Sequence, residues 1–323
     1  MTLREELLYE LERARLTGEV SGEELAKKLG VSRVAVWKAV GKLTEEGFEI
    51  DPVKGKGYRL SYAPQVLSEG RIRALLPPAL SDMPVFVYNE TSSTNDRAKE
   101  AASKGVRRAL FISDRQTAGR GRLGRSFYSP AGVGVYFTYL FTSVRPVEEL
   151  CPVTPFAAVS VSRAVSELCG IEVGIKWVND LYLDGKKVCG ILSEAITSLE
   201  GGDENKIAVG IGINLTTGAF PEELQKKAGA LGAPVDRCAL AAKIASMLFK
   251  FEEDPLDRSF MAEYTARSTV LGKTVELDRW GEKTVGKVTG FDRNGALILD
   301  TGDGQKRTYS GGEISLREVK GGA

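Results

Sequence analysis

The chain has 323 residues, with 44 Lys and Arg against 43 Asp and Glu, and it contains no histidine. This length allows two or three domains, and the near-balance of charge means that any nucleic-acid contact must come from local charge segregation. The lack of histidine excludes Ser-His-Asp catalysis, histidine general bases and histidine-ligated zinc, which leaves Lys, Arg, Asp and Glu to do the chemistry.

The first sixty residues predict a winged helix-turn-helix. Apolar residues recur at helical spacing in three short segments, and the capping box Ser21–Glu24 should begin the second of them. Gly30 should end that helix, and Ser32 should cap the third. Two short segments, residues 48–50 and 57–60, then predict a β-hairpin that would form the wing.

The third helix and the hairpin tip are basic, whereas the first two helices are acidic. This asymmetry favours DNA binding over a protein-interaction module with an incidentally basic face. One such domain would bind DNA weakly and would need a dimer. The candidate DNA-binding residues are Ser32, Arg33, Trp37, Lys38, Lys42, Lys54 and Lys56.

After a linker at Pro64, the pattern predicts an α/β domain followed by a small all-β barrel. The expected helices cover residues 68–76, 91–104, 154–169, 236–251 and 257–268, and the expected strands cover residues 84–88, 109–113, 133–141, 173–183, 187–194 and 207–215. Asp184 and Gly185, between two alternating apolar runs, predict a type I′ hairpin. From Leu271 onward, short strands separated by turns predict the barrel.

Residues 113–130 form a loop in which three glycines alternate with three arginines. Glycine lets backbone N–H groups approach a ligand closely, and guanidinium groups are fork-shaped donors for carboxylate or phosphate, so we expect a mobile clamp for an anionic ligand. Gly119–Gly124 also matches G-x-G-x-x-G, but a dinucleotide site needs a helix after the motif, and the segment around Pro130 has no helical period. A plain solvated surface loop is the other alternative.

Polar groups at two further places are candidates for ligand contacts. Thr91–Asn95 has more hydroxyl and amide groups than one helix cap needs, so these groups either cap the helix or contact a polar, neutral ligand. Lys176 and Lys187 lie among apolar strand residues, where a charge needs a partner, and are candidates for anion contacts. Lys186 fits a solvated edge lysine instead. The two glycines of strand 207–215 permit close backbone approach.

The cysteines and the hydropathy pattern indicate a cytoplasmic protein. Cys189 and Cys238 stand in apolar contexts and no C-x-x-C pair is present, which predicts reduced core thiols. The first residues form no apolar signal segment, and no apolar run reaches membrane-spanning length, so no membrane association is expected.

Several motifs follow one another along the chain: Ser93–Asn95, Gln116, Gly119–Arg125, Lys176–Asp180, Lys187–Leu192, Gly210–Asn214 and Gly311–Arg317. Together they resemble the motifs of the bifunctional biotin–protein ligases that also act as biotin-operon repressors. The resemblance covers essentially the whole chain. It implies an α/β (α+β) fold with an N-terminal winged helix-turn-helix (1–62), a central mixed-sheet domain like that of biotin and lipoate ligases (65–269), and a C-terminal SH3-like β-barrel (270–323).

The resemblance also implies a two-step reaction. The biotin carboxylate would attack the α-phosphate of ATP, supplied with Mg²⁺, to give biotinyl-5′-AMP and pyrophosphate. A lysine of a biotin carboxyl carrier protein would then attack the mixed anhydride and displace AMP. The further partners implied are biotin-operon operator DNA and a second copy of the chain, in a homodimer formed on ligand binding. No residues are assigned as ligands of a resident metal.

Roles for individual residues follow from the same resemblance. The catalytic residues would be Arg122, Lys187 and Lys176. The biotin-binding residues would be Ser93, Thr94, Asn95, Gln116, Gly119, Arg120, Gly121, Arg122, Lys187 and Gly190. The nucleotide-binding residues would be Arg120, Arg122, Arg125, Phe127, Lys176, Asn179, Asp180 and Asn214. Two departures are visible: Val178 stands where the family usually has proline, and Phe127 where an indole is common.

Two alternatives share part of this pattern. A non-enzymatic, ligand-sensing DNA-binding regulator would keep the wing but would not need Lys187. A lipoate–protein ligase would share the adenylation chemistry. A Walker A motif is absent from the sequence, because Arg267 stands where the first glycine before Gly272–Thr274 should be.

Overall fold

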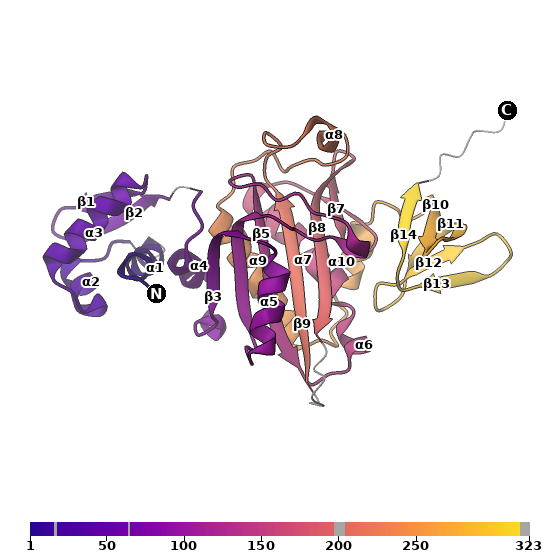
Figure 1. The fold of residues 1–323 in the computed structure, drawn as a ribbon, viewed down its shortest axis with the longest axis horizontal. Coiled ribbons are helices and arrows are strands. Elements are labelled where there is room, and N and C mark those ends of the chain that lie inside the picture. The colour runs from indigo at the N-terminus through magenta and orange to yellow at the C-terminus, as the bar shows by residue number, and fades with distance from the viewer. Residues whose placement is uncertain (16–17, 64, 197–203, 317–323) are drawn as a thin grey trace.

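A computed structural model describes residues 1–15, 18–63, 65–196 and 204–316 (Figure 1). The described residues form three β-sheets of two, seven and five strands. Figure 1 shows the N-terminal helices at one side of the large sheet and the C-terminal strands at the opposite side. Within these ranges, the structure has no helix that is both long enough and apolar enough to cross a membrane.

The N-terminal stretch is a three-helix unit followed by a hairpin. Its elements are α1 (Leu3–Arg15), α2 (Gly22–Leu29), α3 (Arg33–Glu45), β1 (Glu49–Val53) and β2 (Gly57–Tyr62). The apolar stripes of the three helices share one core. The Ser21 hydroxyl accepts the Glu24 N–H at 2.9 Å, and the Ser32 hydroxyl accepts the Ala35 N–H at 3.2 Å. Gly30 ends α2 with a φ of 64°. The predicted caps are therefore present.

The large sheet is mixed, as predicted. Its strand order is β3-β4-β5-β9-β8-β7-β6, in which β3 and β4 are parallel and all other neighbours are antiparallel. The strands are β3 (Val85–Thr91), β4 (Ala109–Gln116), β5 (Gly134–Ser143), β6 (Gly174–Lys176), β7 (Asp180–Leu183), β8 (Lys186–Ile196) and β9 (Asn205–Asn214). Neighbouring residues on β5 enter different cores, because side chains alternate between the two faces of a strand.

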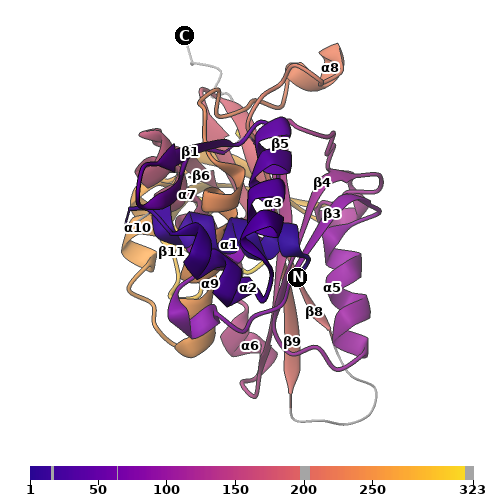
Figure 2. The ribbon, with the colours of Figure 1, turned by 90° about the vertical axis from the view of Figure 1, so that its left-hand side faces the viewer.

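Helices cover both faces of this sheet (Figure 2). On one face, α5 (Thr94–Ser103) packs two alanines against Leu140 of β5. On the other face, α7 (Val153–Cys169) and α9 (Arg237–Glu253) pack over the main core, in which Cys189 and Cys238 are buried free thiols, as predicted. The remaining helices are α4 (Glu69–Leu75), α6 (Val147–Leu150), α8 (Glu222–Gln225) and α10 (Met261–Ala266), with 3₁₀ turns at Pro78–Leu80 and Arg122–Gly124.

The predicted helix over residues 257–268 is wrong in its first part, because α10 covers only Met261–Ala266. The Asp257 carboxylate accepts both the backbone N–H and the hydroxyl of Ser259 at 2.8 Å. The backbone N–H of Leu256 similarly donates to the carboxylate of Asp254 at 3.2 Å. Side-chain acceptors that take up nearby backbone N–H groups favour a turn over a helix.

The C-terminal stretch is a five-stranded antiparallel sheet, in the order β13-β12-β11-β10-β14. Its strands are β10 (Thr274–Arg279), β11 (Glu282–Phe291), β12 (Leu297–Asp300), β13 (Lys306–Tyr309) and β14 (Glu313–Leu316). The buried residues of this sheet join the main core. The indole N–H of Trp177 donates to the carbonyl of Gly295 at 2.9 Å, which ties the turn between β6 and β7 to the same sheet.

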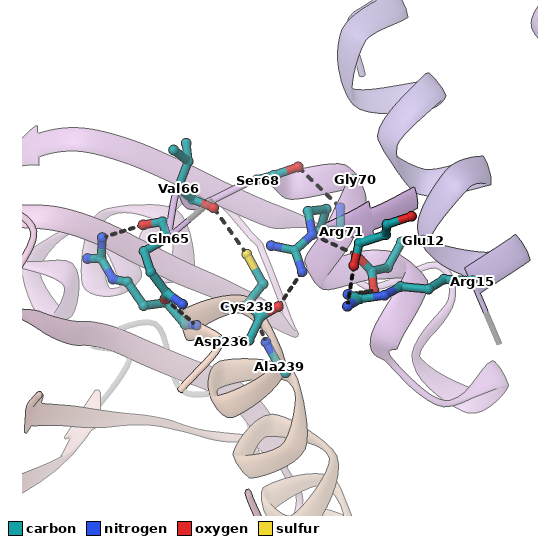
Figure 3. A network of polar contacts seen from close by, with 12 residues as sticks. Glu12, Arg15, Gln65, Val66, Ser68, Gly70, Arg71, Asp236, Cys238 and Ala239 are labelled. Atoms are coloured by element: carbon teal, nitrogen blue, oxygen red, sulfur yellow. Dashed lines mark hydrogen bonds and ion pairs between the residues drawn. The ribbon is translucent and has the colours of Figure 1, made fainter. Parts of the chain in front are cut away.

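A buried ion-pair network joins the helix-turn-helix to the central sheet (Figure 3). The Nε of Arg71, on α4, donates to Glu12 of α1 at 2.6 Å, and its Nη2 pairs with Asp236 at the start of α9. The Arg71 side chain is only 1% exposed. α1 and α4 approach so closely that a Cβ on Gly70 would overlap the carbonyl oxygen of Glu5. The network therefore ties α1 to both α4 and α9.

Candidate functional site

The larger of two adjoining cavities lies between the arginine loop, the β6–β7–β8 hairpins, the segment after α8 and the start of β14. It has a volume of about 290 Å³. Five cationic and two acidic side chains are among its lining: Arg122, Arg125, Lys176, Lys187 and Lys227, with Asp180 and Glu313. This excess of positive charge suits a polyanionic ligand, because clefts lined by one sign of charge concentrate the opposite ion.

The arginine loop is a hydrogen-bonded ribbon. The N–H of Gly121 donates to the carbonyl of Arg125 at 2.7 Å, and the N–H of Phe127 donates to the carbonyl of Gly119 at 2.8 Å. A Cβ on Gly119 would overlap the Phe127 carbonyl oxygen, so the ribbon needs glycine there. The helical turn at the tip has only three residues. A dinucleotide-binding helix, which the G-x-G-x-x-G motif would require, therefore does not follow the loop in this part of the described chain.

The three arginines of the loop contact three different parts of the protein. Arg120 pairs with Asp96 of α5 at 2.9 Å. Arg122 donates to Asn179, in the turn before β7, at 3.2 Å. Arg125 pairs with Glu313 of β14. The loop is thus attached to the helix beside the smaller cavity, to the β6–β7 turn and to the C-terminal sheet.

The hairpin between β7 and β8 carries the predicted type I′ turn, since Asp184 and Gly185 have φ values of 50° and 74°. It brings Lys187 to the cavity, where its Nζ lies 2.7 Å from an oxygen of Asp180. Lys176 enters from β6, with its Nζ 5.3 Å from the centre of the Tyr182 ring. Both lysines predicted to contact anions therefore line the larger cavity.

The smaller cavity, of about 30 Å³, lies between the start of α5 and strands β8 and β9. Its lining includes Ser93, Thr94, Asn95, Gln116, Arg120, Phe127, Gly190 and Gly212. The start of α5 is capped by a side chain from β4. The N–H of Thr94 donates to Oε1 of Gln116 at 2.9 Å. Ser93, at the N-cap position, makes no side-chain cap hydrogen bond to the described residues. Its side chain is instead part of the lining of the smaller cavity.

Two glycines of β9 make room for site side chains, as the sequence predicted. A Cβ on Gly210 would overlap the amide of Asn95, and one on Gly212 would lie 2.5 Å from Cε1 of Phe127. Phe127 lines both cavities. A small polar cavity and a large cationic one therefore share this aromatic residue.

Some predicted residues lie apart from these cavities. Asn214 is buried at the end of β9, where its amide donates to the carbonyl of Gly229 at 2.9 Å, and it is not among the described residues that line either cavity. The predicted DNA-binding residues lie on the helix-turn-helix, where all of them are exposed. Trp37 is 66% exposed on α3, and Lys56 at the hairpin tip lies 3.8 Å from Glu19.

Sequence reasoning assigned no role to Lys227 and Glu313, which line the larger cavity, or to Thr138, whose buried hydroxyl contacts that of Thr94. Lys227 falls in a segment for which no element was predicted. Glu313 lies in the motif Gly311–Arg317, for which the family resemblance implied no residue role. Thr138 stands in an apolar buried strand, where a hydroxyl needs a partner, and that signal was available from the sequence.

Comparisons with known proteins agree with this organisation. Residues 87–214 match the Biotin/lipoate A/B protein ligase family, residues 4–59 match an HTH domain, and residues 270–317 match the Biotin protein ligase C terminal domain. The chain is 33% identical to the bifunctional ligase/repressor BirA of Bacillus subtilis, over 90% of this chain and 92% of that one. It is 29% identical to BirA of Escherichia coli, over 93% and 94% of the two chains.

A solved structure is also similar. The biotin protein ligase of Aquifex aeolicus, in complex with biotin and ATP, superposes with a TM-score of 0.61 at 32% identity. The match covers 73% of this chain and 99% of that one.

Proposed function

Since the chain belongs to the biotin/lipoate A/B protein ligase family, as a biotin protein ligase with an N-terminal helix-turn-helix domain, we propose that its two cavities hold the two reactants of an adenylation. The observation that carries this proposal is that the small polar cavity and the large cationic cavity meet at the Phe127 ring. Biotin is a neutral ring system with a carboxylate tail, and ATP is a polyanion. In polarity and charge, the two cavities match these two kinds of reactant.

The small cavity takes the ureido ring of biotin. Ser93, Thr94, Asn95 and Gln116 supply its hydrogen-bonding groups, and Gly190 leaves space at its floor. Gly119, Arg120 and Gly121 form the ribbon that covers the ligand. The carboxylate tail then points past Phe127 toward the cations of the larger cavity.

The large cavity takes ATP, with Arg122, Lys176 and Lys187 as the catalytic cations. A biotin carboxylate oxygen attacks the α-phosphorus, the bond from that phosphorus to the bridging oxygen breaks, and pyrophosphate leaves with the bonding electrons. The reaction brings two anions together, so fixed cations lower its barrier by neutralising charge and by holding both groups in place. Arg125 and Phe127 lie on the nucleotide side, and Asn214 supports the strand end from behind.

Magnesium enters as part of the substrate, MgATP. Among the described residues, no group of three or more His, Cys, Asp or Glu side chains is placed to hold a metal ion by itself. Mg²⁺ in nucleotide sites is usually held by one or two carboxylates together with substrate phosphates and water. Asp180, with Asn179 beside it, organises the metal side of the nucleotide.

The second step transfers biotin to a carrier. The amine nitrogen of a lysine on a biotin carboxyl carrier protein attacks the acyl carbon of biotinyl-5′-AMP. The acyl–oxygen bond breaks, AMP leaves as the phosphate anion, and the nitrogen releases a proton to solvent.

Adenylate formation in a single turnover tests these roles. Arg122→Ala and Lys187→Ala should each slow it by on the order of 10²–10³, by analogy with the loss of one aimed donor from an oxyanion hole. Lys186→Ala is the matched control, because Lys186 is an exposed neighbour outside the lining of the large cavity. If both variants kept the wild-type rate, the roles assigned to these cations would be wrong.

The helix-turn-helix binds operator DNA of a biotin operon through α3 and the hairpin tip. Exposed Arg33, Lys38 and Lys42 supply cations for phosphates and base edges, and Trp37 offers an apolar surface to the groove. A ligand that orders the arginine loop favours a homodimer, and a homodimer bridges two half-sites.

Operator binding is tested by fluorescence anisotropy on a palindromic site, with and without biotin plus MgATP. We expect tighter binding with both ligands and a shift from monomer to dimer in sedimentation velocity. An affinity indifferent to the ligands would refute the regulatory coupling without touching the ligase activity.

A further inference from the structure

A chain of hydrogen bonds behind the small cavity runs from Glu194 of β8 through Asn95 and Thr138 to Thr94. The amide nitrogen of Asn95 donates to a carboxylate oxygen of Glu194 at 2.7 Å and to the carbonyl of Leu192 at 3.2 Å. Both partners are acceptors only, so the amide must present its nitrogen to them. Its oxygen, Oδ1, consequently faces Thr138.

The fixed amide sets the direction of the two hydroxyls. Thr138 Oγ1, which is fully buried, lies 2.6 Å from Oδ1 of Asn95 and 2.8 Å from Oγ1 of Thr94. Since an amide oxygen only accepts, the single hydrogen of Thr138 goes to Asn95. The contact between the two threonines then requires the Thr94 hydroxyl to donate to Thr138.

The outcome is a pair of hydrogen-free acceptors at the cavity. Thr94 Oγ1 lies within hydrogen-bond distance of Gln116 Oε1, at 3.2 Å, but its hydrogen goes to Thr138 over the shorter contact of 2.8 Å. Gln116 presents its oxygen because it accepts the Thr94 N–H, while its Nε2 donates to Ser129 at 3.0 Å. Both oxygens keep lone pairs for a ligand, so the pair favours a ligand with two hydrogen-bond donors, as the two N–H groups of a cyclic urea are.

We propose that Thr138 and Glu194 are positioning residues that make this subsite an acceptor pair, and thereby select the N–H groups of a cyclic urea. The proposal rests on the proposed function, in which this cavity takes the ureido ring. Glu194 also holds Lys99 through its second oxygen, at 2.5 Å, so both of its oxygens accept. Lipoate, the substrate of the alternative ligase, has a dithiolane ring without N–H groups, so it would leave both cavity acceptors unpaired.

Removing the Thr138 hydroxyl should take one acceptor away from the pair. In Thr138→Val, the Thr94 hydroxyl loses its acceptor and turns its hydrogen to Gln116 Oε1, which lies within reach at 3.2 Å. Gln116 Oε1 then accepts both the N–H and the hydroxyl of Thr94, so the ligand loses that acceptor. In Glu194→Leu, the Asn95 nitrogen keeps only its longer hydrogen bond to the Leu192 carbonyl, at 3.2 Å, so the amide flips more readily. Its nitrogen then donates to Thr138, whose hydrogen passes to Thr94.

The test measures dissociation constants by calorimetry on the full chain, for biotin and for biotin methylated on one ureido nitrogen. Wild type should prefer biotin by roughly 10- to 100-fold, since a buried acceptor left unpaired carries a penalty of that size. Thr138→Val and Glu194→Leu should each abolish most of this preference while leaving the KM for ATP unchanged. Thr138→Ser and Glu194→Gln, which keep the hydroxyl and an acceptor oxygen, should restore it.

Thr142→Val is the control on the same strand, because that hydroxyl donates to the carbonyl of Arg107, away from the cavity. Equal loss of affinity for both ligands in the Thr138→Val chain would indicate a merely structural role and would overturn the proposal. If Thr138→Val does not fold, a wild-type chain that fails to discriminate between the two ligands overturns it as well. Failure of the wild-type chain to form any adenylate would instead refute the proposed function.

Discussion

Replacing Arg71 by methionine should loosen the helix-turn-helix from the central sheet. The change leaves the Glu12 carboxylate, whose side chain is 5% exposed, without the guanidinium that lies 2.6 Å away. Breaking a buried ion pair by removing one partner costs about 3–5 kcal/mol. Arg15 lies 3.4 Å from the same carboxylate and is 38% exposed, so it can take over part of the pairing. We therefore expect a loss near the lower end, about 3 kcal/mol.

The second substitution in a double-mutant cycle should recover most of that loss. In Arg71→Met combined with Glu12→Leu, no charge stays buried, and apolar replacement of a buried pair is often neutral or stabilising. Asp236 keeps a role in both chains, because its carboxylate accepts the N–H groups of Cys238 and Ala239 at the start of α9.

Urea unfolding of the full chain, with amide exchange in α1 and α4 as a local readout, measures the effect. Arg73→Met is the control on the same helix, since its ion pair with Glu69, at 3.5 Å, is partly exposed and should contribute about 0–1 kcal/mol. A loss from Arg71→Met no larger than that from Arg73→Met would refute the reasoning. So would a double variant as unstable as the sum of the two single ones.

Three further outcomes are expected. Gly41→Ala should raise the free energy of unfolding by about 1 kcal/mol, because Gly41 lies inside α3 and an added Cβ meets nothing within 4 Å; a lowered urea midpoint would contradict this. Gly212→Ala should weaken biotin binding by roughly tenfold or more, because the new Cβ forces the Phe127 ring aside. An unchanged dissociation constant from calorimetry would count against the place given to Phe127 beside the bound biotin. Burial raises the pKa of the Cys238 thiol to about 12. At pH 8, iodoacetamide should therefore label the exposed Cys151 first and leave Cys238 unmodified until the chain unfolds. Early modification of Cys238, detected by mass spectrometry, would contradict this.

Local patterns predicted the elements whose stability is local. The helix-turn-helix has both helical spacing and capping residues, and the hairpin at Asp184 has the residue pair that its turn requires. The helix predicted from residue 257 began too early, and the cause is also local: the Asp257 carboxylate accepts the N–H of Ser259 and stabilises a turn. An aspartate two residues before a serine is visible in the sequence, but an argument from the spacing of apolar residues takes no account of it.

The composition of the large cavity could be predicted only in part. Lys187 and Lys176 were identified because a charge among apolar strand residues needs a partner. Lys227 and Glu313 reach the same cavity from distant stretches, and only the packing of the C-terminal sheet and of the segment after α8 brings them there. Nothing in the spacing along the chain encodes that meeting.

The partners of the arginine loop bear on how a phosphate enters the site. Arg120 and Arg125 are paired with carboxylates, and the Lys187 ammonium lies 2.7 Å from the carboxylate of Asp180. These side chains are 32% to 68% exposed on the cationic side, and such pairs contribute about 0–1 kcal/mol each. An incoming phosphate can therefore replace an acidic partner at little cost in stability. Because those pairs also attach the loop to α5 and to β14, an exchange of partners at the nucleotide changes what holds the loop. That change is the physical connection on which the proposed ligand-dependent dimerisation depends.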